Sequence, residues 1–332
     1  MWPLSYEKVT DIAAAMATLE RDIEASPIAG GTELVNWLKD GIARPARLLD
    51  ITGLPALAGI EAGPLGLRLG ALVSMAEVAG HEEVRRDYPA ISEALLLSAS
   101  QQLRNMATMG GNLLQRTRCP YFRAETDLPC NKRRPGSGCA ALTGIDRGLA
   151  IFGWSERCLA THPSDVAVAL VALDAVVHTR SPRAERAIPL VDFHRLPDDA
   201  PERDTVLERG ELIVRIDVPA SPVNRQSHYL KVRERTSFEF ALVSVAAALD
   251  LDPQGRIREA RVALGGVAPK PWRLDAAEAS LRGVGVGDGA GLRAAIEESF
   301  DLARPRRQNG FKVELAKRAV VRALQTAGEV QA

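Results

Sequence analysis

The sequence has no excess of charge of either sign, because Lys and Arg number 42 among its 332 residues and Asp and Glu also number 42. It therefore lacks the basic surplus that favours binding to nucleic acid or to an anionic membrane surface. No segment approaches the roughly 18 consecutive apolar residues of a membrane-spanning helix. Residues 1–8 show no basic stretch followed by an apolar one, so we find no secretory signal. We expect a soluble protein that binds neither nucleic acid nor a membrane.

Residue combinations that are typical of hydrolytic enzymes are also missing. The five histidines are scattered along the chain, which argues against a hydrolytic zinc site. No Ser–His–Asp set and no pair of carboxylates with catalytic spacing stands out. We therefore expect the chemistry to belong to a bound cofactor, for which the protein supplies binding, orientation and electrostatics.

Hydrophobic periodicity predicts an α+β protein with three parts. Helix and strand patterns alternate over the first 115 residues or so, vanish between about 116 and 160, and then return. We place an N-terminal α/β subdomain at 1–55, a second subdomain at 56–221 and a C-terminal α+β domain at 222–332. The expected helices are 11–23, 33–39, one that begins at 74, 91–102, 165–173, 276–281, 292–299 and 311–327. The expected strands are 26–29, 47–51, 65–72, 175–179, 211–218, 228–232, 244–251 and 257–264.

Two turns of paired glycines are candidates for ligand binding. Gly30 and Gly31 stand between a short apolar run and the second expected helix, and Gly110 and Gly111 stand in a similar turn flanked by Thr and Asn. Glycine lets the backbone approach a ligand closely, and the free N–H groups at a helix start favour phosphate. Neither turn matches G-x-G-x-x-G, so a Rossmann fold is only weakly indicated. The turns are either ordinary tight turns or two binding loops for the pyrophosphate of a dinucleotide.

The motif order resembles the FAD subunit of the xanthine dehydrogenase and carbon monoxide dehydrogenase family. The glycine turns resemble its paired signature, residues 160–165 the segment that follows, residues 211–213 and 229–233 the strands beside the flavin ring, and residues 265–271 its C-terminal domain. The resemblance covers essentially the whole chain. It implies noncovalent FAD in a two-subdomain fold of the vanillyl-alcohol-oxidase (PCMH) type, followed by a C-terminal domain of the carbon monoxide dehydrogenase flavoprotein type. The implied cofactor contacts are Pro27, Ile28, Ala29, Gly30, Gly31, Thr32, Glu33, Leu34, Thr108, Gly110, Gly111, Asn112, His162, Asp165, Ile213 and Lys231.

Some of these contacts also have ordinary structural explanations. Asp165 follows Ser164 at a helix start and is suited to capping that helix. His162 beside Pro163 could simply shape a turn, and Lys231 could be a solvated charge on a strand. The flavin roles of these residues depend on the resemblance.

The four cysteines lie within one 40-residue window. Cys119, Cys130, Cys139 and Cys158 are separated by 10, 8 and 18 residues, without the close pair that is usual in structural zinc sites. Their number allows two disulfides in three pairings, or the four thiolates of a [4Fe–4S] cluster. Residues 116–160 resemble the insertion in the periplasmic aldehyde oxidoreductase branch of the family, which carries such a cluster. The resemblance implies that these cysteines are its ligands.

The resemblance further implies a subunit of a heterotrimer. A molybdenum-cofactor subunit would oxidise an aldehyde, a small [2Fe–2S] subunit would pass the electrons on, and the FAD of this chain would deliver them to an acceptor. The chain would be cytoplasmic, or periplasmic by export with a partner that bears a signal. The alternatives are a self-contained flavin oxidase or reductase and a flavin-free binding module held together by zinc or disulfides.

Overall fold

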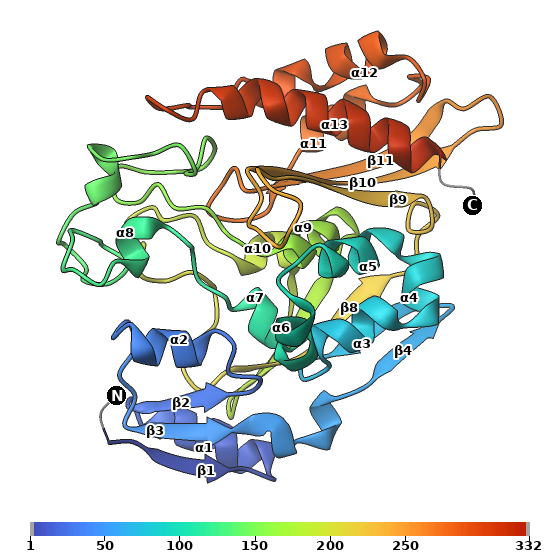
Figure 1. Cartoon of the computed structure of the whole chain (residues 1–332). Coiled ribbons are helices and arrows are strands. Elements are labelled where there is room, and N and C mark those ends of the chain that lie inside the picture. The colour runs from blue at the N-terminus through green and yellow to red at the C-terminus, as the bar shows by residue number, and fades with distance from the viewer. Residues whose placement is uncertain (1–2, 330–332) are drawn as a thin grey trace.

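The computed structural model describes residues 3–329 and contains three sheets, which follow one another from the N-terminal to the C-terminal part of the molecule (Figure 1). The N-terminal sheet is parallel, with the strand order β1-β3-β2. The helix α1 buries Met16 and Leu19 in the core of this part. Its elements are β1 (Ser5–Lys8), α1 (Ile12–Arg21), β2 (Ala25–Ile28), α2 (Leu34–Lys39) and β3 (Arg47–Asp50).

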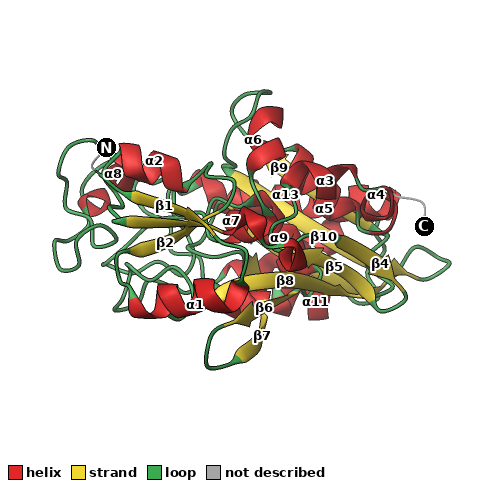
Figure 2. Cartoon of the chain, turned by 90° about the horizontal axis from the view of Figure 1, so that it is seen from below, coloured by secondary structure: helices red, strands yellow, loops and turns green. Residues whose placement is uncertain are grey.

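The middle sheet is antiparallel, with the order β4-β5-β8-β6-β7 (Figure 2). All eight residues of α9 are buried, and its apolar side chains belong to a core that reaches from this sheet to the C-terminal sheet. Ser74 and Glu77 form a capping box that starts α3. The elements are β4 (Ile60–Gly63), β5 (Gly66–Gly70), α3 (Met75–Gly80), α4 (Glu82–Asp87), α5 (Pro89–Leu96), α6 (Gln101–Met106), α7 (Met109–Leu113), α9 (Asp165–Ala172), β6 (Val176–Arg180), β7 (Glu185–Pro189), α10 (Leu190–Phe193) and β8 (Leu212–Pro219).

The C-terminal sheet is antiparallel, with the order β12-β11-β10-β9. The long helix α13 packs on β10 and β9, α11 packs on β11, and α12 contacts α13 and α11. On the other side, α5 and α9 of the middle part also contact this sheet. Its strands are therefore buried from both sides, as the buried run in β10 shows. The elements are β9 (Ser227–Val232), β10 (Val243–Leu251), β11 (Ile257–Gly265), β12 (Trp272–Arg273), α11 (Asp275–Ser280), α12 (Gly289–Ile296) and α13 (Phe311–Glu329).

The segment 116–160 is irregular, as expected, and contains only the short helix α8 (Pro120–Arg123) and a 3-10 turn at Ala140–Leu142. Polar contacts attach it to the C-terminal domain. The Lys312 ammonium donates to the carbonyls of Gly148 (3.0 Å) and Leu149 (3.2 Å). Burial lowers the pKa of Lys312 to about 7. This buried lysine connects α13 to the irregular segment.

The expected α+β fold class is confirmed, but the single helix expected at 91–102 is wrong. The helix α5 ends at Leu96, Ala99 has a φ of 47°, and α6 begins at Gln101. Ser100 caps α6, because its hydroxyl accepts from the Leu103 amide. The break directs residues 98–99 toward the cavity described below. The strands β1, β4, β7 and β12 were not expected.

Candidate cofactor-binding site

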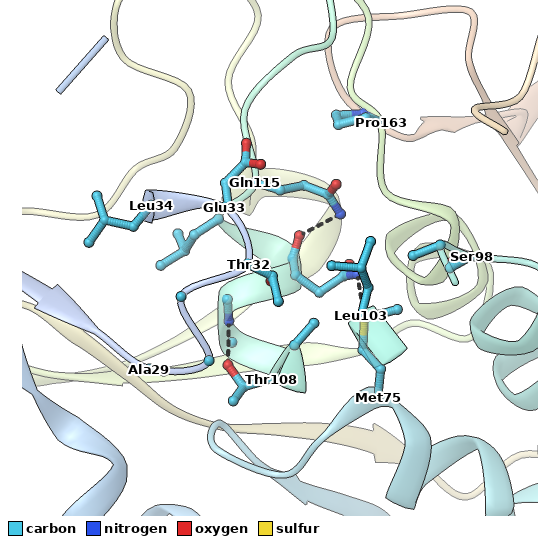
Figure 3. A pocket seen from close by; sticks show the side chains of 18 of the residues that line it. Ala29, Thr32, Glu33, Leu34, Met75, Ser98, Leu103, Thr108, Gln115 and Pro163 are labelled. Carbon is cyan, nitrogen blue, oxygen red and sulfur yellow. Dashed lines mark hydrogen bonds between the residues drawn. The ribbon is translucent and has the colours of Figure 1, made fainter. Parts of the chain in front are cut away.

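A cavity of about 570 Å³ lies where the two glycine turns meet (Figure 3). Pockets of this size hold cofactors and other small molecules. Residues from all three sheet regions contribute to its wall. The predicted contacts that line it are Pro27, Ile28, Ala29, Gly30, Gly31, Thr32, Glu33, Leu34, Thr108, Gly110, Gly111, Asn112, Asp165, Ile213 and Lys231.

The first glycine turn leads from β2 toward α2 and packs against the C-terminal end of α6. A Cβ atom at Gly30 would overlap the carbonyl oxygen of Met106 and would lie 2.6 Å from the carbonyl carbon of the same residue. Gly31 has a φ of 70°, in the left-handed region that favours glycine. Backbone geometry therefore requires both glycines, and Gly30 permits the first turn to reach the segment that leads into the second.

The second glycine turn is held by its own polar side chains. The Thr108 hydroxyl accepts from the Gly111 amide (3.2 Å) and caps α7. The Asn112 amide donates to the sulfur of Met75 (3.3 Å), and its oxygen accepts from the Ser164 hydroxyl (2.5 Å). Both side chains were expected to offer donors to a ligand. In the structure they have contacts within the protein, which fix the turn beside the start of α9.

A buried ion pair marks another part of the cavity wall. The Asp165 carboxylate accepts from Ser98 (2.9 Å), Tyr229 (2.6 Å) and Lys231 (2.8 Å). The side chains of Lys231 and Asp165 are only 1% and 7% exposed. Burial raises the pKa of the Asp165 carboxyl, while Lys231 acts in the opposite direction. Removing one partner would leave the other charge buried without compensation.

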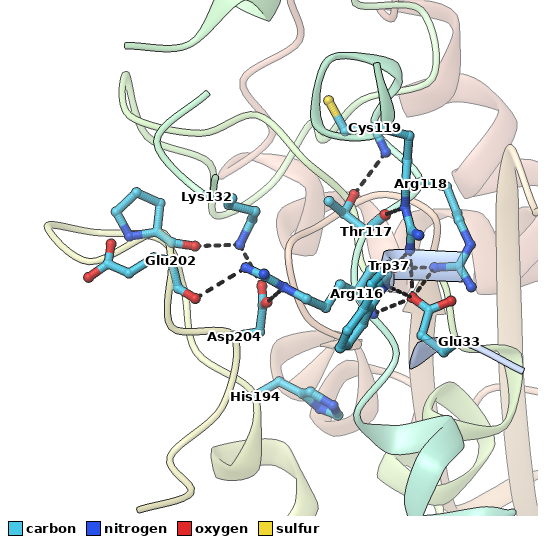
Figure 4. A network of polar contacts seen from close by, with 12 residues as sticks. Glu33, Trp37, Arg116, Thr117, Arg118, Cys119, Lys132, His194, Glu202 and Asp204 are labelled. Atoms are coloured by element: carbon cyan, nitrogen blue, oxygen red, sulfur yellow. Dashed lines mark hydrogen bonds and ion pairs between the residues drawn. The ribbon is translucent and has the colours of Figure 1, made fainter. Parts of the chain in front are cut away.

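The carboxylate of Glu33 connects the first glycine turn to the irregular segment (Figure 4). Its Oε1 accepts from Trp37 Nε1 (3.0 Å), the Arg116 amide (3.1 Å), Arg118 Nη1 (2.7 Å) and Arg123 Nη2 (2.5 Å). Glu33 is the N-cap residue of α2, but its side chain makes no capping bond. The residue predicted as a cofactor contact therefore holds the arginines in place beside the cavity.

A second carboxylate, Asp204, continues this network toward the cysteines. Its oxygens accept from Arg116 Nε (2.6 Å) and Lys132 Nζ (2.5 Å). The Lys132 side chain is 7% exposed and also donates to the carbonyl of Pro201 (2.7 Å). Burial acts to raise the pKa of Asp204, but Lys132 and Arg116 hold it below its usual value. The network therefore stays charged although it is largely removed from water.

The four cysteines predicted as metal ligands lie together around one small buried cavity. All are free thiols, and Cys130 and Cys139 are opposite each other in an isolated β-bridge. Burial raises the pKa of Cys119 to about 12 and that of Cys158 to about 11, where Lys132 opposes the rise. Among residues 3–329, no group of three or more His, Cys, Asp or Glu side chains could hold a metal ion.

His162 does not line the cavity, whereas its neighbour Pro163 does. Its ring is buried and its centroid is 4.2 Å from that of His194, which contacts the carbonyl of Leu113 (2.8 Å). Burial lowers the pKa of His162 well below its usual value and that of His194 to about 4, so both rings are neutral near pH 7. A contact of His162 with the flavin stays a prediction.

Several lining residues were not predicted from the sequence. Ser98 and Ala99 were placed inside a helix, although Ser100 is a capping residue that could have indicated the break. Arg118 belongs to the irregular segment, and Phe240 belongs to the loop that follows β9. Neither residue carries a motif that distinguishes it. No helix within residues 3–329 is long and apolar enough to cross a membrane.

Comparisons with known proteins agree with this geometry. The family model for the FAD binding domain in molybdopterin dehydrogenase matches residues 3–221, and that for the CO dehydrogenase flavoprotein C-terminal domain matches residues 228–327. The aldehyde oxidoreductase FAD-binding subunit PaoB of Escherichia coli K12 is 49% identical over 326 residues, which are 98% of each chain. The glyceraldehyde dehydrogenase medium chain of Sulfolobus acidocaldarius is 26% identical over 93% of this chain and 92% of its own.

A solved structure shows the same fold. Carbon monoxide dehydrogenase from Hydrogenophaga pseudoflava superimposes with a TM-score of 0.75 at 24% identity, and the match covers 100% of both chains. The family model and the 49% identical relative show that the cofactor is FAD. The chain belongs to the FAD-binding subunits of the molybdenum hydroxylase family and is an oxidoreductase subunit of a multi-subunit complex.

Proposed function

We propose that this chain is the electron-transfer subunit of a molybdenum-dependent aldehyde oxidoreductase. The observation that carries the proposal is the 49% identity, over 98% of both chains, to a subunit named for aldehyde oxidoreductase and for FAD binding. A more distant relative is named as part of a glyceraldehyde dehydrogenase. In a heterotrimer, a molybdenum-cofactor subunit would oxidise the aldehyde and a small [2Fe–2S] subunit would pass the electrons to this chain.

The cavity wall is suited to FAD. Gly30 and Gly110 allow close backbone packing, which places both turns beside the same cavity, where they would hold the diphosphate. Ile213 supplies an apolar surface, and the Asp165–Lys231 pair supplies fixed charges that would lie near the flavin ring. When bound, FAD provides the redox chemistry that links one-electron carriers to an acceptor. The protein orients the cofactor and sets its electrostatic surroundings.

The cysteine site would hold a [4Fe–4S] cluster. Four thiols around one buried cavity are the complete ligand set of such a cluster. A single metal ion needs all its ligands around one point, whereas a four-iron cluster spreads its thiolates over four irons. Lys132, whose charge acts on Cys158, would offset part of the negative charge of the thiolates. This chemistry supports a cluster over a zinc ion.

The experiment is an anaerobic purification of the chain with its partner subunits, and of the chain alone. Each preparation is assayed for FAD, iron, sulfide and turnover of aliphatic and aromatic aldehydes with a dye acceptor. We expect turnover by the complex only, with FAD and about four iron and four sulfide in this chain. Aldehyde turnover by the single chain would favour a self-contained flavin enzyme. A complex that carries FAD but oxidises no aldehyde would refute the substrate class, and FAD without iron would refute the cluster.

A further inference from the structure

Arg118 brings the cysteine-bearing segment into the wall of the FAD cavity. It lines the cavity, and its guanidinium is 5.0 Å from the centroid of Phe240, which lines the cavity from the loop that follows β9. Nη1 donates to Glu33 (2.7 Å) and to the carbonyl of Arg116 (2.5 Å), while Nη2 donates to Gln115 (3.3 Å). The guanidinium is therefore held in one position directly beside the first glycine turn.

The network around Arg118 contains more positive than negative charge. Two carboxylates, Glu33 and Asp204, share four cations, and no further ion pair joins these groups in the described part of the chain. Two positive charges are therefore uncompensated. The other charged residues of the cavity wall form pairs of their own, Asp165 with Lys231 and Arg235 with Glu239. The four cations are Arg116, Arg118, Arg123 and Lys132.

The carboxylate of Glu33 does not fully compensate the burial of the Arg118 charge. Burial is the main cause that lowers the pKa of Arg118; Glu33 opposes it, and the neighbouring Arg123 adds to it. Within the described residues, Arg118 is the one of the four cations that lines the cavity. A diphosphate in the cavity would supply an anion to Arg118, the cation of this network that lines the cavity.

We propose that Arg118 is a further FAD-binding residue, which donates to the diphosphate of the cofactor and is positioned for this by Glu33. The inference rests on the assignment of the cavity to FAD. Arginine suits this task because its guanidinium forms charge-assisted, often paired hydrogen bonds with phosphate oxygens. It gives the cysteine-bearing segment a role in FAD binding that does not depend on electron flow through a cluster.

The test uses Arg118→Gln, with Arg123→Gln as a matched control. Both substitutions remove one arginine that is paired with Glu33, but only Arg118 lines the cavity. The full chain, assembled with its partners, is stripped of flavin and titrated with FAD and with riboflavin, which has no phosphate. We expect Arg118→Gln to weaken FAD binding at least tenfold and Arg123→Gln less than about threefold. Riboflavin binding should be equal in both variants.

Arg118→Lys retains the charge and should recover part of the FAD affinity, which separates loss of charge from loss of folding. Raising the salt concentration should weaken FAD binding in the wild type more than in Arg118→Gln. Equal FAD affinity in Arg118→Gln and Arg123→Gln would overturn the inference, as would an equal loss of riboflavin affinity in Arg118→Gln. A wild-type chain that binds no FAD would instead refute the cofactor assignment itself.

Discussion

Substituting Gly30 by Ala should separate the two glycine turns and release FAD. The added Cβ would overlap the carbonyl oxygen of Met106 and approach its carbonyl carbon to 2.6 Å. Carbon atoms pack best at about 3.5–4.0 Å, so the backbones must move apart by at least about 1 Å, and the overlap with the carbonyl oxygen requires more. The neighbouring atoms are backbone atoms, which cannot rotate away as a flexible side chain could. The clash therefore acts directly on the spacing between the turns.

The magnitude follows from the cost of overpacking, which is about 1–3 kcal/mol in well-packed sites. If the displacement is relieved by giving up the bound geometry of the turns, FAD affinity falls by roughly 10- to 100-fold, because 1.4 kcal/mol corresponds to a factor of ten. Gly80→Ala is the matched control, since no atom lies within 4 Å of a Cβ at that position. This control should retain full FAD occupancy.

The assay measures FAD released per chain after purification of the complex, and FAD affinity of the flavin-free complex by fluorescence quenching. Circular dichroism of the same samples checks that Gly30→Ala remains folded. A folded Gly30→Ala variant with wild-type affinity would refute the argument that the first turn must pack closely on Met106 for FAD to bind. An equal loss in Gly80→Ala would show that the effect does not depend on this contact.

Three further predictions concern buried charges and thiols. Asp165→Asn leaves the Lys231 ammonium without its carboxylate. The added net positive charge should raise the flavin midpoint potential by about 30 mV or more, which is about 1.4 kcal/mol for two electrons. A spectroelectrochemical titration measures the shift, and an unchanged potential would contradict the prediction. Cys130→Ser should reduce iron and sulfide in the chain while FAD remains, as chemical assays of the complex would show. Lys312 has a pKa of about 7 when folded and 10.5 as its ordinary value, so the unfolded state binds more protons between these values and the free energy of unfolding should rise with pH there. Urea titrations should find this rise in the wild type and lose it in Lys312→Met.

Regular elements with a strong apolar period could be predicted well from the sequence. The strand expected at 211–218 is β8 (Leu212–Pro219), and the helix expected at 311–327 is α13 (Phe311–Glu329). In both, burial follows the apolar pattern, so the pattern alone locates the element. The first strand was missed because all four residues of β1 are exposed. Its pairing with β3 depends on backbone hydrogen bonds rather than on an apolar face.

The glycine turns could be predicted, because paired glycines mark positions where the backbone packs closely or adopts a positive φ. The partners of the charged residues were not. Glu33 is 83 residues from Arg116 in sequence, and Lys132 is 72 residues from Asp204. Local pattern determines neither pairing, because both depend on how the irregular segment folds back over the first sheet. For the same reason Arg118 could not be recognised as part of the cavity wall.

The irregular segment is ordered by contacts that do not involve its thiols. Arg306 and Arg307 donate to carbonyls at 142 and 143, while Asn309 and Lys312 donate to carbonyls at 148–150. At its other end the segment is attached to Glu33 through Arg116, Arg118 and Arg123. The polar backbone of a segment without regular structure must find such partners when it is buried. Because these partners come from both neighbouring domains, we expect them to hold the segment in place without a cluster, so that loss of iron in Cys130→Ser should leave the FAD cavity intact.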